Sequence, residues 1–412
     1  MTTPSTTFPA AQVAAASRAT YAAFIGSGFA FASWASRIPQ VRDQLELSSA
    51  ELGLLLLAIA AGSLIALPMA GLIVHRLGSR QTVMVMAILL GAGLLTVALG
   101  NLVGIVPVVI GLFLLGFANG AWDVSMNVQG ASVEQHLGRS IMSRYHAGFS
   151  LGTVAGGGVG AVMVLADISV TLHLLVVAIG TAVVVPLAVR GFLPDLADSA
   201  DHGAGKADRG SVFRRWREPR TLLIGVFVFA FAFAEGTGND WIAVSLIDGY
   251  QASAAAGTVA FAVFLAAMTA GRWFGPNLLD RYGRVTVVRT LAVVATGGLL
   301  VFIFSPSTPV AFIGIALWGA GTSLGFPVGM SAAADDPAAA AGRVSVVASI
   351  GYCAFLAGPP LIGFLGEHVS VLKALTVVAG LLAVAALVAT ALRPLPGTDQ
   401  PNPALTADER DG

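Results

Sequence analysis

Charged residues are scarce in this chain of 412 residues. Asp, Glu, Lys and Arg make up 11% of the sequence, whereas soluble domains carry about 25%. Hydrophobic residues reach 56%, and twelve apolar stretches have roughly the 20 residues needed to cross the hydrocarbon core of a bilayer. The shortage of charge excludes an ordinary soluble domain and indicates an all-α membrane protein embedded in a lipid bilayer.

Other absences narrow the function. A single cysteine, Cys353, excludes an internal disulfide. The net charge of +0 gives no basic surplus, so we expect no nucleic-acid partner. The sequence has no phosphate-binding glycine loop, metal-ligand cluster or nucleophile triad. We therefore expect no cofactor and no metal, and neither an enzyme nor a self-contained ATP-driven pump.

The apolar stretches predict twelve transmembrane helices in two six-helix bundles. They lie at about 18–38, 50–74, 81–100, 104–130, 141–165, 169–190, 220–247, 253–279, 285–304, 309–331, 343–366 and 369–392. The predicted parts are a tail (1–17), a first bundle (18–190), a polar cytoplasmic linker (191–219), a second bundle (220–392) and a disordered tail (393–412). Because no small-residue cleavage site follows the first stretch, we expect a retained helix and not a signal peptide.

The basic residues predict the orientation. Arg37, Arg42 and Lys373 fall on one side of the predicted membrane and Arg272 within a span, while the other basic residues fall on the opposite side. By the positive-inside rule, the side with the many basic residues is cytoplasmic. Twelve spans place both termini there.

The two predicted bundles carry an internal repeat. Gly111 and Gly116 recur as Gly314 and Gly319, which is 203 residues later (314 minus 111). Asp123 falls on Phe326 at the same offset, so the pattern is duplicated and its acid is not. Two halves that start on the same side are parallel repeats, and transporters built this way hold substrate between them near the midplane.

The sequence between the second and third predicted helices resembles a signature of the major facilitator superfamily, Gly-x-x-x-Asp-Arg-x-Gly-Arg-Arg/Lys. The first copy reads Gly71-x-x-x-His75-Arg76-x-Gly78-Ser79-Arg80, and the second copy keeps Asp280-Arg281-x-Gly283-Arg284. The resemblance implies the fold of that superfamily, a monomer, and a gating role for these residues in closing the cytoplasmic face. His75 stands where the family has an acid, which would make this closure weaker or pH-dependent.

Further segments are similar to bacterial inner-membrane members of the superfamily, which implies an inner-membrane location. They include Ala234-Glu235-Gly236, Asn239-Asp240-Trp241 and Leu324-Gly325-Phe326-Pro327. Asp123-x-x-x-Asn127 is similar to the Glu-x-x-x-Asn of the fucose permeases, proton-coupled sugar importers in which this acid is implicated in coupling and sugar recognition. The second acid of those permeases falls on Ala35 here.

Asp123 and Asn127 are the first pair of candidate ligands for substrate or protons. Their i, i+4 spacing places them on one face of a helix. A carboxylate inside a bilayer costs about 2.5–3.5 kcal/mol on insertion scales, which favours a functional role. A structural acid paired with a nearby arginine or histidine is the alternative.

Glu235 and Asn239 form a second i, i+4 pair, near the middle of the seventh predicted helix. Gly236 and Gly238 beside them suggest a kinked or unwound segment, which is tolerated only where backbone lines protein or a cavity. A carboxylate that merely packs helices together is the alternative. Asp240 could equally be a solvated acid near the membrane surface.

Arg272 lies well inside the eighth predicted helix and must face the bundle interior and find a partner. That partner could be Glu235, which would be structural, or Asp123, or an anionic substrate. His146 could share the Asp123 pocket as a proton relay, because histidine titrates near neutral pH; a plain hydrogen-bonded histidine is the alternative. Arg37 could line the outer vestibule.

These residues favour a secondary active transporter of a small solute, driven by protons as a symporter, with sugar-like import slightly preferred. Proton-driven efflux of amphiphilic compounds stays open because the seventh helix is rich in phenylalanine. A membrane sensor on a transporter scaffold and a lipid translocator are further alternatives. The expected partners are a small-molecule substrate, protons and the bilayer.

Overall fold

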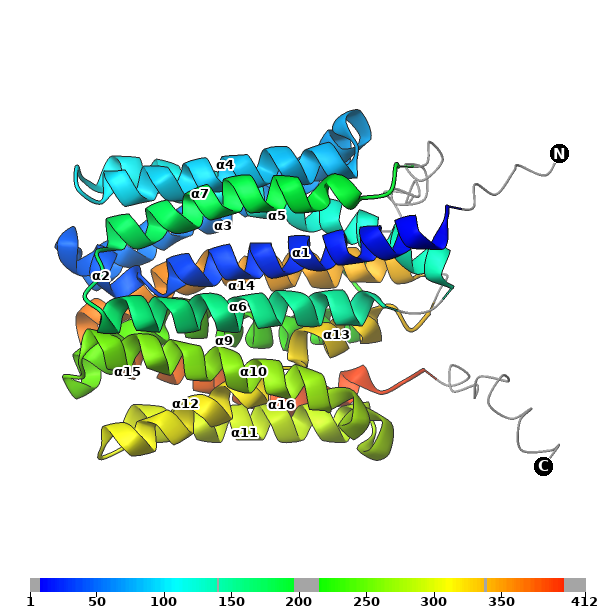
Figure 1. The fold of residues 1–412 in the computed structure, drawn as a ribbon. Coiled ribbons are helices and arrows are strands. Elements are labelled where there is room, and N and C mark those ends of the chain that lie inside the picture. The colour runs from blue at the N-terminus through cyan, green and yellow to red at the C-terminus, as the bar shows by residue number, and fades with distance from the viewer. Residues whose placement is uncertain (1–7, 139–140, 196–214, 337–338, 396–412) are drawn as a thin grey trace, which may run out of the picture.

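The computed structural model describes residues 8–138, 141–195, 215–336 and 339–395, and all regular structure in these ranges is helical (Figure 1). The first half comprises α1 (Ala10–Ala35), α2 (Ile38–Gln44), α3 (Ser49–Leu77), α4 (Ser79–Gly100), α5 (Ile105–Leu137), α6 (Met142–Leu165), α7 (Val170–Ala188) and η1 (Val189–Gly191). The second half comprises α9 (Pro219–Tyr250), α10 (Ala254–Tyr282), α11 (Arg284–Phe304), α12 (Thr308–Thr322), α13 (Gly325–Ala333), α14 (Ala340–Val369), α15 (Val371–Ala374), α16 (Thr376–Val388) and η2 (Ala389–Leu392).

Within the described ranges, eleven helical segments are long and apolar enough to cross a membrane. Helix α1, with 26 residues, runs alongside them and completes the expected set (Figure 1). The all-α membrane fold is therefore as predicted. Three boundaries differ: the first helix starts at Ala10, the expected loop after it contains α2, and the tenth expected helix is divided into α12 and α13.

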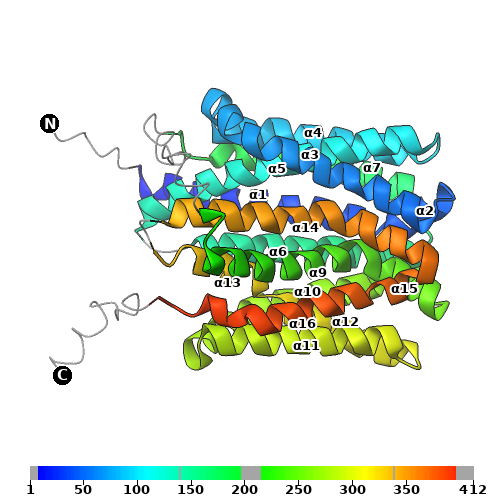
Figure 2. The same ribbon diagram turned by 180° about the vertical axis from the view of Figure 1, so that it is seen from behind.

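The helices pack as two groups, α1–α7 and α9–α16, that face each other along their whole length (Figures 1 and 2). Helix α3 packs against α14, and α6 packs against α10, so these two pairs join the groups. We call the groups the first and second bundle. The first residues of α1 and the last residues of α16 lie at one end, here called the terminal end, and α2 and α15 lie at the opposite, far end (Figure 2).

The internal repeat is visible in backbone detail. Helices α3 and α10 each have 29 residues, and each starts after a serine whose hydroxyl accepts a hydrogen bond from the backbone three residues on. They end at Gly78 and Gly283, both with φ +79. Positive φ values also recur at Glu46 and Gln251. Matching caps and turns at matching positions are what a duplicated helix pair requires.

A glycine face on α5 brings α3 close. A Cβ added to Gly116 would overlap the carbonyl oxygen of Ile59, and the hydroxyl of Ser63 donates to the carbonyl oxygen of Gly116 over 2.9 Å. Small residues at such contacts let transmembrane backbones approach closely. This contact fixes the rotation of α5 and with it the direction of Asp123.

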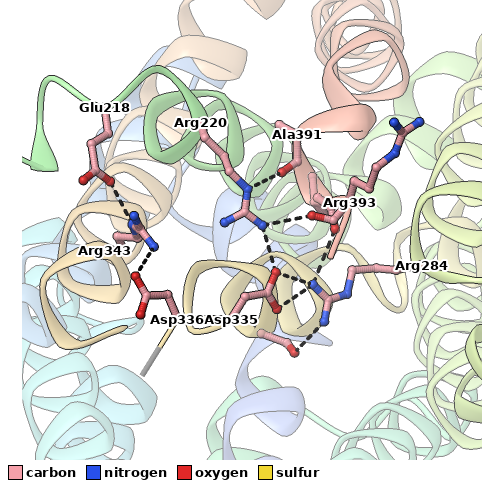
Figure 3. A network of polar contacts seen from close by, with 10 residues as sticks. Glu218, Arg220, Arg284, Asp335, Asp336, Arg343, Ala391 and Arg393 are labelled. Atoms are coloured by element: carbon pink, nitrogen blue, oxygen red, sulfur yellow. Dashed lines mark hydrogen bonds and ion pairs between the residues drawn. The ribbon is translucent and has the colours of Figure 1, made fainter. Parts of the chain in front are cut away.

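An ionic network joins the helix ends of the second bundle at the terminal end (Figure 3). The carboxylate of Asp335 binds Arg284 at 2.9 Å and Arg220 at 2.8 Å, and only 7% of its side chain is exposed. Glu218 binds Arg343 at 2.8 Å and also pairs with Arg215. Because these residues come from four separate segments, the network holds the terminal end of the second bundle as one unit.

The polar linker predicted at 191–219 is described only at its edges. Predictions that concern residues 1–7, 139–140, 196–214, 337–338 or 396–412 lie outside the described residues. At the near edge, Asp195 accepts hydrogen bonds from the backbone nitrogen of Ser79 at 2.7 Å and from its hydroxyl at 2.6 Å. The start of the linker is thus attached to the start of α4.

Candidate functional site

A cavity of about 300 Å³ lies between the two bundles. Helices α1, α3, α5 and α6 line it from one side and α9, α10 and α14 from the other. Most of the wall is apolar. The charged and amide side chains that reach it are Asn119, Asp123, Glu235, Asn239, Asp240 and Arg272. The structure therefore brings four of the six predicted ligands to one cavity and adds Asn119 and Asp240.

Asp123 is half-buried on the cavity face of α5. The side-chain amide of Asn127 donates to its Oδ1 at 3.3 Å and to its backbone oxygen at 2.8 Å. The predicted i, i+4 relation is present, but Asn127 does not line the cavity. No basic residue of the described chain forms an ion pair with Asp123, so its charge is not neutralised by a fixed partner.

Glu235 is the counter-ion of Arg272. The guanidinium Nη2 lies 2.7 Å from Oε1 of Glu235, with 28% and 18% of the two side chains exposed. Both residues belong to the second bundle, α9 and α10. Of the partners considered for Arg272, the structure selects Glu235 and leaves Asp123 without it.

A break between α12 and α13 explains the position of Arg272. Pro327 has no backbone N–H, so it cannot donate to the carbonyl oxygen of Ser323 four residues earlier. The Nε of Arg272 donates to that oxygen instead, at 3.2 Å. Irregular backbone at membrane depth needs such a partner. Arg272 therefore has a structural role in addition to lining the cavity.

The predicted unwinding of α9 near Glu235 is wrong, because α9 is one continuous helix from Pro219 to Tyr250. Gly236 and Gly238 serve packing instead. A Cβ on Gly236 would lie 3.0 Å from Phe355, and one on Gly238 would overlap the ring of Phe264. The glycines make room for aromatic rings from α14 and α10.

Two residues of the cavity were not predicted from the sequence, and a third, Asp240, was left open between two positions. The Oδ1 of Asn119, one turn before Asp123, accepts a hydrogen bond from Ser27 at 2.9 Å. Tyr352 of α14 lines the cavity and interacts electrostatically with Asp123. Asp240 lines the cavity without a hydrogen bond or ion pair to the described residues. The i, i−4 spacing of Asn119 to Asp123 was the available signal.

Two other predicted positions are placed differently. His146 is exposed on α6, where its ring packs edge-to-face on Phe24 at 5.1 Å. It does not line the cavity and makes no hydrogen bond to Asp123, although it interacts electrostatically with Arg272. Arg37 does not line a vestibule: it is 2% exposed and donates to His173 at 2.9 Å.

The predicted gating residues lie at the terminal end. In the part of the chain that the structure describes, the side chains of His75, Arg76, Arg80 and Asp280 form no hydrogen bond or ion pair. Arg281 packs on the ring of Tyr282, and Arg284 binds Asp335 within its own bundle. Gly78 and Gly283 provide the turns. No described ion pair of these motifs joins the two bundles.

The hydrogen bonds between the bundles lie at the far end, as far as the described residues go. Arg42 of α2 forms a bidentate ion pair with Asp248 of α9, and its second hydrogen bond measures 3.0 Å. Glu367 of α14 accepts a hydrogen bond from the backbone nitrogen of Ala50 at 3.0 Å. Gly363 packs on the backbone of Ser49 nearby. The bundles are therefore closed together at the far end.

Comparison with known proteins shows relatives along nearly the whole chain. A profile described as Major Facilitator Superfamily matches residues 19–355 and 236–411. The transporter y4wD of Sinorhizobium fredii is 30% identical over 379 residues, which cover 91% of this chain and 98% of that protein. An MFS-type transporter of Yersinia pestis is 32% identical over 375 residues, with 90% and 94% covered.

Solved structures share the fold at low sequence identity. The nucleoside transporter NupG has a TM-score of 0.70 at 16% identity and covers 91% of this chain and 98% of its own. The E. coli fucose:proton symporter FucP has a TM-score of 0.57 at 16% identity, with 91% and 98% covered.

Proposed function

This chain belongs to the major facilitator superfamily, and from that premise we propose that it moves a small solute by alternating access, coupled to protons. It is a membrane transport protein and not an enzyme. Membership of the superfamily does not specify which residues bind the solute and the coupling ion. The cavity between the bundles supports an assignment.

The observation that carries the proposal is that the Asp123 carboxylate has no fixed counter-ion in the described structure. This carboxylate lines an apolar cavity between the bundles without a basic partner among the described residues. An unpaired charge in such surroundings costs several kcal/mol, so the acid is stabilised by a proton or by a ligand. A group that exchanges its proton when a ligand or the access route changes is the minimum requirement for coupling. Asn119, Glu235, Asn239 and Arg272 complete the proposed binding wall.

The two ends of the molecule support alternating access. The far end is held closed by Arg42–Asp248 and by Glu367, whereas the gating motifs at the terminal end do not bridge the bundles. The excess of basic residues near the terminal end makes that end cytoplasmic in our proposal, with the protein in the inner membrane. The cavity then faces the cytoplasm. Among inner-membrane proteins, the motifs resemble those of YbjJ.

The gating role of His75, Arg76, Gly78, Arg80, Asp280, Arg281, Gly283 and Arg284 stays a prediction for the opposite state, in which the terminal end would close. The efflux alternative loses its main support. Phe231 and Phe233 are buried against Gly325 and Gly358, and neither they nor Phe227 line the cavity. The sugar-like import suggested by Asp123 and Asn127 stays a prediction.

Replacing Asp123 tests the proposal. Asp123→Asn keeps the shape and the hydrogen bond to Asn127 but cannot release a proton. We expect it to abolish proton-coupled solute movement in proteoliposomes while the thermal unfolding temperature stays near that of the wild type. The matched control is Asp167→Asn, because Asp167 is an exposed acid with φ +52, where asparagine is readily accommodated. Gradient-dependent transport in Asp123→Asn would remove Asp123 from the coupling role.

A further inference from the structure

The charges that line the cavity do not balance. Three carboxylates reach it, from Asp123, Glu235 and Asp240, against one guanidinium, from Arg272. Glu235 and Arg272 neutralise each other at 2.7 Å. Asp123 and Asp240 remain, one from each bundle, and neither has a cationic partner in the described structure. The cavity is thus built with two acids in excess.

Two excess acids constrain what the cavity accepts. An anionic solute would be repelled by both carboxylates. A neutral solute supplies no charge, so both acids would have to be neutralised by protons alone in a mostly apolar wall, where an isolated charge is costly. A cation offers each carboxylate a charge-assisted hydrogen bond, which is about twice as strong as a neutral one. Of the three charge classes, a cation is favoured by this wall.

Aromatic rings line the same cavity. Phe31, Phe149, Tyr352 and Phe355 reach it from α1, α6 and α14. A cation over such a ring is attracted by its quadrupole, by about 0.5–2 kcal/mol as water is removed. Carboxylates beside aromatic faces form a site for ammonium groups. A cavity of about 300 Å³ limits the solute to a small molecule.

We infer that the transported solute is a small amine that carries a positive charge and is held by Asp123 and Asp240. This inference rests on the proposed function, since it names the substrate class of the same cavity. The titratable and charged groups that share the cavity wall with these acids are Glu235 from α9, Arg272 from α10 and Tyr352 from α14. His146 of α6 lies outside this wall and interacts electrostatically with Arg272. Because an ammonium and a proton cannot occupy one carboxylate together, the amine competes with protons.

Matched triads of small solutes test the inference. Each triad shares one carbon skeleton and carries an amine, a hydroxyl or a carboxylate; n-butylamine, 1-butanol and butyrate are one example, because a simple alkylamine stays protonated at both pH values used, and tetraethylammonium is added as a fixed cation. Thermal unfolding of the purified full chain is followed with each compound at pH 8 and pH 5.5. We expect amines alone to raise the unfolding temperature, by several degrees at pH 8 and less at pH 5.5.

Variants connect the effect to the two acids. Asp123→Asn and Asp240→Asn should each weaken amine stabilisation at least tenfold in apparent affinity, whereas Asp167→Asn should leave it unchanged. Stabilisation by the neutral or acidic members, or by no amine at all, would overturn the inference. If a neutral member is bound and moved by a proton gradient, the proposed function stands and only the charge of the substrate is wrong. If no compound is bound or moved, both proposals fail.

Discussion

At the scale of single residues, the guanidinium of Arg272 binds two acceptors at once. Arg272 neutralises Glu235 and also donates to the free carbonyl oxygen of Ser323. A guanidinium suits this double role because its donors form a rigid, planar fork. The pair therefore connects α9, α10 and the α12–α13 break.

Removing one member of this pair should cost more than removing both. Glu235→Gln leaves the Arg272 charge unpaired, and we expect a loss of about 2 kcal/mol of stability, reduced from the fully buried case by the partial exposure of both side chains. In Glu235→Gln with Arg272→Gln, the loss should be smaller than the sum of the single losses. Chemical denaturation of the four proteins of this double-mutant cycle measures the coupling. Additive losses would show that the pair is not energetically coupled.

Single residues also show how far sequence reasoning reaches. Asp123 and Glu235 were predictable because a carboxylate within a long apolar stretch is conspicuous. Asp240 was not assigned, since its distance from the predicted helix end did not distinguish a cavity from the membrane surface. The choice of Glu235 over Asp123 as partner of Arg272 depends on helix packing across α9 and α10. No spacing along the chain contains that information.

At the scale of elements, Gly78 and Gly283 start α4 and α11 with φ +79 and ψ near 155–159. This backbone region is nearly restricted to glycine and costs other residues on the order of 1–3 kcal/mol. Both Gly78→Ala and Gly283→Ala should lower the unfolding temperature. Gly78→Ala should lower it more, because its Cβ would lie 2.6 Å from the Asp195 carboxylate, whereas Gly283 has free space around it.

Gly180→Ala is the control for these two variants. Gly180 lies inside α7 with no neighbour within 4 Å of an added Cβ, so alanine there should be neutral or stabilising, by at most about 1 kcal/mol. An equal loss in all three variants would show that the turn conformation is not what the glycines provide.

The ionic network at the terminal end should make stability depend on pH through Glu218. Burial opposes ionisation of Glu218, but hydrogen bonds from Arg343, Arg215 and Thr221 outweigh it and hold its pKa at about 2 instead of 4.5. A depressed pKa stabilises the folded state fully above pH 4.5, and this contribution is lost as pH falls toward 2.

Glu218→Gln should therefore lower stability at pH 6, and its difference from the wild type should shrink between pH 4.5 and pH 3. Thermal unfolding across this range measures the difference. The control is Glu46→Gln, an exposed acid whose side chain has no hydrogen-bond partner among the described residues, which should change little at any of these pH values. A difference that stays constant down to pH 3 would contradict the assigned role of Glu218.

The elements also show why one helix break was not predicted. Pro68, Pro276 and Pro359 lie inside helices α3, α10 and α14, which remain continuous. Pro327 instead lies in the first turn of a new helix, α13, which begins at Gly325; there Arg272 reaches the freed oxygen of Ser323 and Gly325 fits against Phe231. Helix number and the repeat follow from composition and spacing. The effect of a proline follows from its neighbours in space.

At the scale of the whole molecule, the ion pair Arg42–Asp248 closes the far end between the bundles. Its side chains are 12% and 41% exposed, so the pair contributes at most about 1 kcal/mol. Opening and closing of bundles is an equilibrium that such an energy shifts by roughly fivefold. Asp248→Asn should therefore increase the population that is open at the far end.

Labelling of a buried cysteine measures that shift. In Cys353→Ala, which removes the native thiol, Leu56→Cys places a thiol on the α3 wall of the cavity. With a membrane-impermeant maleimide added on the far-end side of oriented vesicles, Asp248→Asn should raise the labelling rate about fivefold.

Asp43→Asn separates the effect of the Arg42–Asp248 ion pair from a general effect of lost charge. Asp43 pairs with Arg42 within α2 and forms no ion pair with the second bundle in the described structure. Its loss should leave the labelling rate of Leu56→Cys unchanged, because the bridge from Arg42 to Asp248 remains. Equal acceleration by Asp43→Asn and Asp248→Asn would mean that α2 merely loosens. Acceleration by Asp248→Asn alone would show that the far end opens when one bond between the bundles is removed, as alternating access requires.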